Sequence, residues 1–336
     1  MRLIRLMIVS MTNSPPNPSS SDCHGWIVLD KPVGISSAKA VAIVRKAFKG
    51  MKTGHAGTLD PLASGVLPIA LGEATKTISY VMTAQKSYEF SLVWGAETQT
   101  DDTEGEVTQR SDIRPSEADI LAALPAFTGL IQQIPPDYSA VKVAGQRAYA
   151  VARNADKNNQ EGSAKLALAA RDIQIDSFDL LSCDAESARF HVVCGKGSYI
   201  RSLARDLGRA LGTAAHVTAL RRLSVGKFSV ADAISLDLLD KVGQSAPAYS
   251  YITSILTVLD DIPAVALNEV QARKLRFGQV VLLTEAQISP IVCLGSRDDS
   301  EAVIAVFNDH PVALVKLDGM QISPIRVLNL QPEHLV

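Results

Sequence analysis

The sequence predicts a mixed α+β protein with one large unit and a smaller β-rich unit at its C-terminal end. Strand-like runs and amphipathic helical segments share most of the chain. From about Leu259 the composition changes, and short apolar runs follow one another at the spacing of a small β-barrel. The length of 336 residues and the 47% of hydrophobic side chains suffice for one large core and a second small one.

The N-terminal residues predict a tail rather than a targeting segment. Residues 1–10 are briefly apolar, too short for a secretory signal, and Met11 is an alternative start. Residues 12–22 are rich in Pro, Ser and Asn, which is typical of disorder. We therefore expect a disordered tail over 1–22, a large unit over 23–256 and a small unit over 257–336.

Composition excludes several classes of protein. No apolar run reaches the roughly 18–20 residues that span a bilayer, so we expect no membrane partner. The four cysteines show no C-x-x-C spacing, which gives neither a zinc motif nor a disulfide framework and favours the cytoplasm. Cys194 is either a reactive thiol or a buried core residue, and burial is the commoner fate of a free cysteine.

The first predicted elements are a strand and a helix. Residues 25–34 predict a strand that ends in a Pro-Gly turn. Ser36 or Ser37 then caps a helix that runs to about Phe48, with Val44 among its apolar positions. We expect its basic residues to face outward: Arg45, Lys46 and Lys49.

A single carboxylate, Asp60, follows on a loop within GHAGTLDPLASGVLPIALGEATK (54–76). Glycines let this loop turn sharply, and Pro61 fixes the bend after Asp60. The apolar run 66–71 predicts a buried strand beside the loop. An Asp before Pro also caps ordinary turns, so these residues alone allow either a turn or a functional acid.

The middle of the chain predicts further strands and one helix. Residues 86–94 alternate as a strand, in which Tyr88 is either a core ring or a binding-site ring. We interpret the acidic loop with Asp101 and Asp102 as a solvated turn, because it lacks the roughly six to eight oxygens of a calcium site. The remaining segments predict a helix over 112–130, a strand over 138–143, a flexible loop over 154–169, and strands over 171–181 and 187–193.

An amphipathic helix is predicted after the sequence CGKGSY. Ile200, Leu203, Leu207 and Leu211 recur at helical spacing, and Gly212 is a plausible stop. Arginines recur every four residues on another face, at 201, 205 and 209. The order of a phosphate-binding loop is absent around Gly195, so a nucleotide triphosphatase is not expected.

The C-terminal part predicts, in order, a helical segment and a strand over 214–230, a short helix and connector over 231–256, a short helix into Gly278, and four strands. The strand-like runs are VVLL (280–283), IVCLG (291–295), EAVIAVF (301–307) and VALVKL (312–317).

Positive charge is segregated although the net charge is only −2. Residues 31–59 contain six cations and no acid, and residues 195–227 contain seven cations and one acid, Asp206. Such stretches can form positive surfaces that attract phosphates, or they can be ordinary solvated helix faces.

Five of these segments together resemble the TruB family of tRNA pseudouridine synthases. They are LDKPVGISS (29–37), TGHAGTLDP through LGEATK (53–76), YSAVK (138–142), KGSYIR (196–201) and LRR (220–222). The resemblance covers residues 25–230. It departs from the family only at Ser64, where Thr is common, and in the long polar loop after 153.

The resemblance implies a pseudouridine synthase fold, with a mixed, largely antiparallel sheet flanked by helices. It also implies isomerisation of uridine 55 in the T-arm of tRNA by a monomer that needs no guide RNA, cofactor or metal. The residues LRFGQ (275–279) are similar to a PUA-like RNA-binding module, for which a purely structural β cap is the alternative.

The resemblance also assigns roles to individual residues. Asp60 is the catalytic carboxylate, Arg201 pairs with it, and Tyr88 stacks on the target base and assists proton transfer. Tyr199 is implied as a residue of the same pocket, Leu220 as its wall, Asp102 as a structural partner of the active-site cations, and Arg221 and Arg222 as arginines that face RNA. From its place on the loop we interpret His55 as a binding residue that fills the space of the departed base or contacts phosphate. We interpret Lys31 as a structural or phosphate-facing cation.

The chemistry explains why such residues are needed. The N1–C1′ bond of uridine breaks, the base turns, and C5 bonds to C1′, so one carboxylate must act as a nucleophile or as a base toward the 2′ proton. Burial would raise the pKa of that acid, and a guanidinium beside it would lower it again. The uridine must first be flipped out of the RNA, where an aromatic ring can receive it.

Two other classes of function are compatible with parts of the sequence. A non-catalytic RNA-binding protein would share the basic segments but would not require Asp60. A carboxylate hydrolase usually needs a second acid or a metal ligand at a defined separation, and no partner acid to Asp60 stands out.

Overall fold

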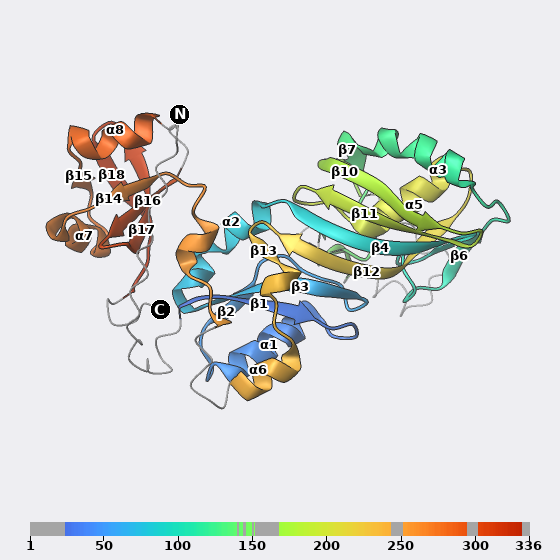
Figure 1. Ribbon diagram of the computed structural model, residues 1–336, viewed down its shortest axis with the longest axis horizontal. Coiled ribbons are helices and arrows are strands. Elements are labelled where there is room, and N and C mark those ends of the chain that lie inside the picture. The colour runs from blue at the N-terminus through green and yellow to red at the C-terminus, as the bar shows by residue number, and fades with distance from the viewer. Residues whose placement is uncertain are drawn as a thin grey trace.

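The computed structural model describes residues 24–139, 141–143, 146–149, 151, 168–242, 251–293 and 302–330. The predicted tail and most of the predicted polar loop lie outside these residues. Within them, the chain forms a nine-stranded mixed sheet and, toward the C-terminus, a five-stranded sheet. Figure 1 shows the smaller sheet as a separate body beside one end of the larger one. The mixed α+β class with a curled C-terminal sheet is therefore confirmed.

The larger sheet runs in the order β1-β3-β12-β4-β11-β10-β7, with β2 paired to β3 and β13 to β12. Its neighbours are antiparallel except β3 and β12, which run parallel. The bounds of these strands are β1 Gly25–Lys31, β2 Thr53–His55, β3 Ala63–Leu71, β4 Lys86–Trp94, β7 Gly129–Gln133, β10 Arg171–Cys183, β11 Ser187–Cys194, β12 Ala215–Val225 and β13 Phe228–Ser229.

Helices cover one face of this sheet in two pairs. In Figure 1, α1 (Ser37–Ala47) and α6 (Leu236–Val242) lie beside β1, and α3 (Glu117–Ala123) lies beside β10. The helix α5 (Ile200–Ala210) packs on β12 and β4. All four helices share one hydrophobic core with the sheet, because alternate residues of each strand point to the same side. In β1, for example, Ile27 and Leu29 enter this core, whereas Trp26 and Val28 point to the opposite face.

That opposite face carries the contact with the smaller unit. Trp26, Val28 and Phe228 pack in one cluster with Ile304 and Leu328 of the C-terminal part. Polar contacts support this packing: Lys76 Nζ donates to the Val327 carbonyl at 2.8 Å, and Glu73 accepts from the Asn329 backbone N–H at 2.6 Å. The two units are therefore joined by hydrophobic packing and by hydrogen bonds as well as by the chain.

The smaller sheet has the order β14-β16-β17-β18-β15. Its elements are β14 Ala264–Ala266, α7 Glu269–Arg276, β15 Val281–Leu282, α8 Glu285–Cys293, β16 Ala302–Phe307, β17 His310–Asp318 and β18 Gln321–Val327. Short elements complete the chain: η1 Gly72–Thr77, α2 Ile78–Thr83, β5 Ala96–Thr98, β6 Val107–Arg110, η2 Leu124–Phe127, β8 Lys142–Val143, β9 Gln146–Arg147, η3 Val230–Asp232 and η5 Ile255–Val258.

Four predicted elements differ from the structure. The strand predicted over 138–143 is shorter, because the described residues of this segment have strand structure only in β8. The helical segment predicted after residue 214 is wrong, because β12 is one strand inserted between β3 and β4. The run 291–295 was predicted as a strand, but its described start is the end of α8. The helix predicted over 112–130 is shorter, because the chain passes through a 3₁₀ turn and enters β7 at Gly129.

Candidate active site

Asp60 lies on the loop between β2 and β3, and two side chains hold the backbone of this loop. Ser37, at the start of α1, donates to the Leu59 carbonyl at 2.9 Å and accepts from the Leu59 N–H at 2.8 Å. The Arg222 guanidinium donates to the Gly57 carbonyl at 3.1 Å. Ser36, as predicted, caps α1 by accepting from the Lys39 N–H. The loop that carries Asp60 is thus fixed from a helix and from a strand.

Arg201 is the direct partner of Asp60. Its Nε lies 2.9 Å from Asp60 Oδ2, although the two residues are far apart in sequence. The same guanidinium donates from Nη1 to the Thr100 carbonyl at 2.6 Å and from Nη2 to the Tyr138 carbonyl at 3.0 Å. The side chain of Asp60 is 36% exposed and that of Arg201 is 5% exposed. The carboxylate of Asp60 is therefore partly exposed to solvent, whereas the arginine that pairs with it is buried.

The acidic loop after β5 is buried, so its interpretation as a solvated turn is wrong. Asp101 and Asp102 are 6% and 2% exposed, and they face the arginines of α5. Asp102 Oδ2 lies 3.5 Å from Arg201 Nη1, and Asp101 Oδ2 lies 2.8 Å from Arg205 Nη1. Burial raises the pKa of Asp101 to about 6, while Arg205 opposes that rise. The positive φ of 60° at Asp101 helps turn both carboxylates toward the helix.

The α5 arginines are therefore not an RNA-facing stripe. Arg209 makes a bidentate pair with Glu97, at 2.7 Å and 2.5 Å, which completes a ladder of three arginines on three neighbouring acids. Arg221 pairs with Asp30 in the same bidentate way. Arg222 is 1% exposed, so the expectation that it faces RNA is wrong for this residue. Most cations of the basic stretch 195–227 therefore bind carboxylates or backbone carbonyls of the protein itself.

Two of the predicted substrate-binding residues, Tyr88 and Leu220, lie on central strands, and a third, Tyr199, lies at the start of α5. Tyr88 on β4 is 8% exposed, and burial raises its pKa, with Arg222 and Asp60 among the charges that act on it. Leu220 on β12 is buried and pairs in register with Phe90 and Ala63. Tyr199 precedes α5, where its ring faces the Arg171 guanidinium at 6.0 Å and its backbone is held by Gln133.

Lys31 and His55 are the remaining predicted residues. Lys31 is fully buried and donates to the carbonyls of Pro32 and Ile35 at 2.9 Å and 2.8 Å. Burial lowers its pKa to about 8, although the Asp60 charge raises it. Burial, and then Arg222, lower the pKa of His55 below its ordinary value. His55 Nδ1 is buried and has no hydrogen-bond partner in the described part of the chain.

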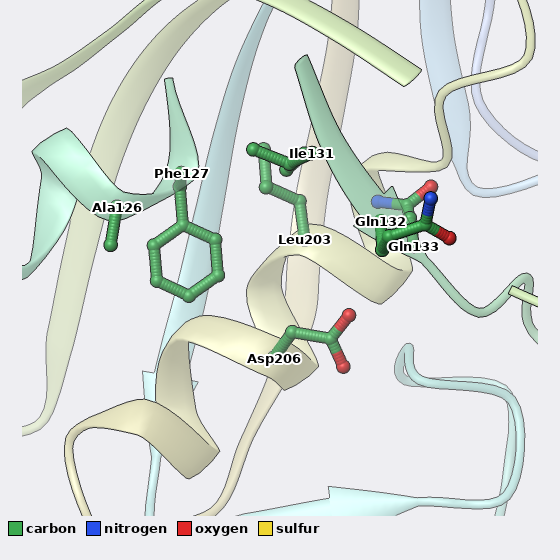
Figure 2. A pocket seen from close by; sticks show the side chains of 7 residues that line it. All are labelled: Ala126, Phe127, Ile131, Gln132, Gln133, Leu203 and Asp206. Atoms are coloured by element: carbon green, nitrogen blue, oxygen red, sulfur yellow. The ribbon is translucent and has the colours of Figure 1, made fainter. Parts of the chain in front are cut away.

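A cavity of about 440 Å³ lies elsewhere on the larger unit. Figure 2 shows Phe127 of η2, three residues of β7, and Leu203 and Asp206 of α5 around it. None of the predicted site residues lines this cavity. Among the residues that the structure describes, no group of three or more His, Cys, Asp or Glu side chains is placed to hold a metal ion, and no helix is long and apolar enough to cross a bilayer.

Sequence reasoning missed two residues that shape the site. Ser37 was considered only as a helix cap, and Arg222 only as a surface arginine, yet both hold the Asp60 loop. The adjacent serines and adjacent arginines were visible in the sequence. Nothing in their spacing indicates which member of each pair turns inward.

Known structures share this architecture. The archaeal box H/ACA sRNP Nop10–Cbf5 complex contains a chain with a TM-score of 0.67 and 21% identity, and the match covers 94% of this chain and 89% of that one. The present chain therefore shares the fold of that chain, and it carries the Asp60–Arg201 pair beside its central strands.

The sequence comparisons identify the family. The family models for the TruB family pseudouridylate synthase N-terminal domain and the tRNA pseudouridylate synthase B C-terminal domain match residues 45–200 and 201–262. A tRNA pseudouridine synthase B of Rhodospirillum rubrum is 49% identical over 91% of this chain and 97% of its own. Another, of Bradyrhizobium diazoefficiens, is 45% identical over 92% and 87%. The chain belongs to the TruB family, and it is an isomerase that converts uridine to pseudouridine.

Proposed function

We propose that Asp60 is the catalytic carboxylate and that the substrate is uridine 55 in the T-arm of tRNA, modified by a monomer in the cytoplasm without guide RNA. The observation that carries this proposal is the 2.9 Å contact between Asp60 and the buried Arg201, inside the family's own motifs. An ionised acid is needed at C1′ or C2′ of the flipped nucleotide, and the guanidinium favours the ionised form. A base that entered beside Asp60 would cover its exposed side.

The neighbouring residues have matching roles in this proposal. Tyr88 receives the flipped base, and Leu220 forms the wall beneath it. His55, whose lowered pKa favours the neutral ring, fills space near the loop without adding charge. Tyr199 binds substrate beside the start of α5. Lys31 supports the site by holding the turn before α1, where it donates to the Ile35 carbonyl. Asp102 supports the site through its contact with Arg201.

The test uses Asp60→Asn, which keeps the shape of the side chain and removes its charge. With unmodified tRNA transcript and no added metal or cofactor, the unaltered protein should form pseudouridine at position 55. The variant should bind the transcript and form none. The matched control is Asp179→Asn, which alters an exposed carboxylate on β10. Turnover by Asp60→Asn would overturn the proposal, and binding without modification by both proteins would favour a non-catalytic RNA-binding function.

A substrate deuterated at C2′ of the target uridine distinguishes the two possible actions of Asp60. If Asp60 removes the 2′ proton, single-turnover rates should show a primary isotope effect. If Asp60 attacks C1′ as a nucleophile, the isotope effect should be small, because no bond to the 2′ hydrogen breaks.

We also propose that residues 23–256 form the catalytic unit and that residues 257–336 form a PUA-like unit that contacts the same tRNA. The exposed face of α7 supports this assignment. Val270, Arg273, Lys274 and Phe277 recur at helical spacing and are exposed, and Phe277 is 74% exposed. No acid pairs with either cation in the described residues. An exposed ring between free cations suits phosphates and an unstacked base.

A further inference from the structure

Arg222 on β12 is a buried arginine that pairs with no carboxylate among the described residues. It is 1% exposed, and its guanidinium donates to three backbone carbonyls and also interacts with the Tyr88 phenol. Nε donates to the Val66 carbonyl at 2.7 Å, Nη2 to the Gly57 carbonyl at 3.1 Å, and Nη1 to the Thr58 carbonyl at 3.5 Å. A buried charge without an ion pair is costly, so its retention calls for a reason.

The three carbonyls lie on the two sides of Asp60. Gly57 and Thr58 precede it on the loop, and Val66 follows it on β3. The guanidinium therefore connects the loop to the strand, and the planar fork fixes the distance between them. Because these contacts flank Asp60, movement of Arg222 would alter where the carboxylate points.

The backbone of Arg222 is also locked in place. It pairs in parallel register with Gly65 on β3 and in antiparallel register with Tyr88 on β4. Gly65 has a φ of +100°, and a Cβ at that position would lie 2.1 Å from the Arg222 carbonyl oxygen. Only glycine permits this approach, which places Arg222 between the Asp60 loop and the strand of Tyr88.

The charge of Arg222 acts on the groups around the site. After burial, it is a cause of the lowered pKa values of His55 and Lys86, and it contributes to the lowered pKa of Lys31. It also interacts with the phenol of Tyr88. The Asp60 loop is thus in contact with a second buried guanidinium, that of Arg222, in addition to Arg201.

We propose that Arg222 is a positioning residue for pseudouridine formation. It holds the loop carbonyls so that the Asp60 carboxylate meets Arg201 on one side and the flipped nucleotide on the other. Arg222 does not touch RNA. This proposal rests on the proposed catalytic role of Asp60 and adds a residue that acts through that acid.

The experiment compares Arg222→Met, which loses both charge and fork, with Arg222→Lys, which keeps a charge and loses the fork. We expect kcat to fall about 100-fold in Arg222→Met, because small misplacements of a reacting group have effects of this size. Arg222→Lys should lose at least about tenfold, and its result decides the question if the Met variant does not fold. The Kd for tRNA should stay within about threefold in both.

The pKa of the His55 ring is lowered first by burial and then by the charge of Arg222, so the comparison of the two variants separates loss of that charge from hydration of the ring. With ¹³C-labelled histidine, assigned by His55→Gln, the NMR titration of His55 should move to higher pH in Arg222→Met, where the nearby charge is lost. It should stay near its original position in Arg222→Lys. Arg189→Met, an exposed arginine on β11 paired with Glu89, is the matched control and should keep kcat.

Two results would overturn the proposal: an Arg222→Lys protein with the original kcat, or variants that weaken tRNA binding while kcat is unchanged. The second result would return Arg222 to the RNA interface. These failures are separable from failure of the Asp60 role. If Asp60→Asn is inactive and the Arg222 variants are fully active, only the positioning proposal fails.

Discussion

At the scale of single residues, Arg201 shows why an arginine is needed opposite Asp60. One planar group contacts two carboxylates and two carbonyls, which come from residues 60, 100, 102 and 138. A lysine has a single nitrogen at the end of a flexible stem and cannot satisfy this set.

We therefore expect Arg201→Lys to lower the single-turnover rate of pseudouridine formation by about 100-fold or more, because charge and orientation around Asp60 are both disturbed. The dissociation constant for tRNA, measured by filter binding, should change by less than about threefold. A rate near that of the unaltered protein would contradict the importance of the four contacts.

Lys86 leads to a prediction about pH and stability. Burial lowers its pKa to about 8 from the ordinary 10.5. The unfolded chain therefore binds more protons between these values, and the free energy of unfolding contributed by this group rises as pH increases through that window. Lys86→Met removes the cost of the buried charge, so its stability relative to the unaltered protein should be highest near pH 7. By pH 10 that advantage should shrink by roughly 1–2 kcal/mol, because solvent screens part of the cost of the buried charge.

Urea unfolding at about pH 7 and about pH 10 measures this difference. Lys316→Met, at an exposed lysine on β17, controls for the loss of an amine from the surface. An equal advantage of Lys86→Met at both pH values would contradict the prediction.

The approach of Arg201 to Asp60 could be anticipated from sequence motifs, whereas the burial of Asp101, Asp102 and Arg222 could not. Acids in a Thr-rich loop and adjacent arginines look like solvated groups when each segment is considered alone. Their burial depends on α5 and β12 packing against loops that lie 104 and 165 residues away in the sequence. Local pattern carries no information about such partners.

At the scale of elements, β12 is the strand on which the site depends, and it was partly predicted as helix. Ala, Leu and Arg are good helix formers, so the local preference of residues 214–222 favours a helix. Pairing with β3 and β4 overrides this preference, because the strand fills the gap between them. By contrast, β1, α1, β4 and α5 have strong local periodicity, and their predicted positions agree with the structure.

The close contact between β3 and β12 predicts a large effect of Gly65→Ala. The added Cβ would meet the Arg222 carbonyl oxygen at 2.1 Å, in addition to the strain of a positive φ. We expect the free energy of unfolding to fall by at least about 3 kcal/mol, measured by urea unfolding. Gly129→Ala is the control, because its φ of +93° is similar but nothing lies within 4 Å. It should cost only about 1–2 kcal/mol, and equal losses in the two variants would contradict the argument.

At the scale of the whole molecule, the two basic stretches have different fates. Most cations of residues 195–227 bind acids or backbone carbonyls of the protein itself. By contrast, five cations on and after α1 are exposed and have no acidic partner in the described residues: Lys39, Arg45, Lys46, Lys49 and Lys52. Counting charges along the sequence could not separate the two, because only the fold brings the acids of 97–102 to α5.

We predict that the α1 surface contacts tRNA phosphates. The double variant Lys46→Gln, Lys49→Gln should weaken tRNA binding and reduce the slope of log K against log salt by about 2, with kcat unchanged at saturating tRNA. The double variant Arg273→Gln, Lys274→Gln tests the α7 face in the same titration. Lys227→Gln is the control, because acids at 260 and 261 already pair with Lys227. An unchanged slope in the first variant would exclude α1 from the interface.

The convergence of residues 60, 100, 102 and 138 on Arg201 has a consequence for synthesis of the chain on the ribosome. Asp60 emerges early, but its counter-charge emerges 141 residues later. A nascent or truncated chain that stops before α5 would hold the reactive acid with no guanidinium to orient it. Such fragments would be inactive as enzymes even where their first strands had assembled, so pseudouridine formation would report a polypeptide that extends at least through α5.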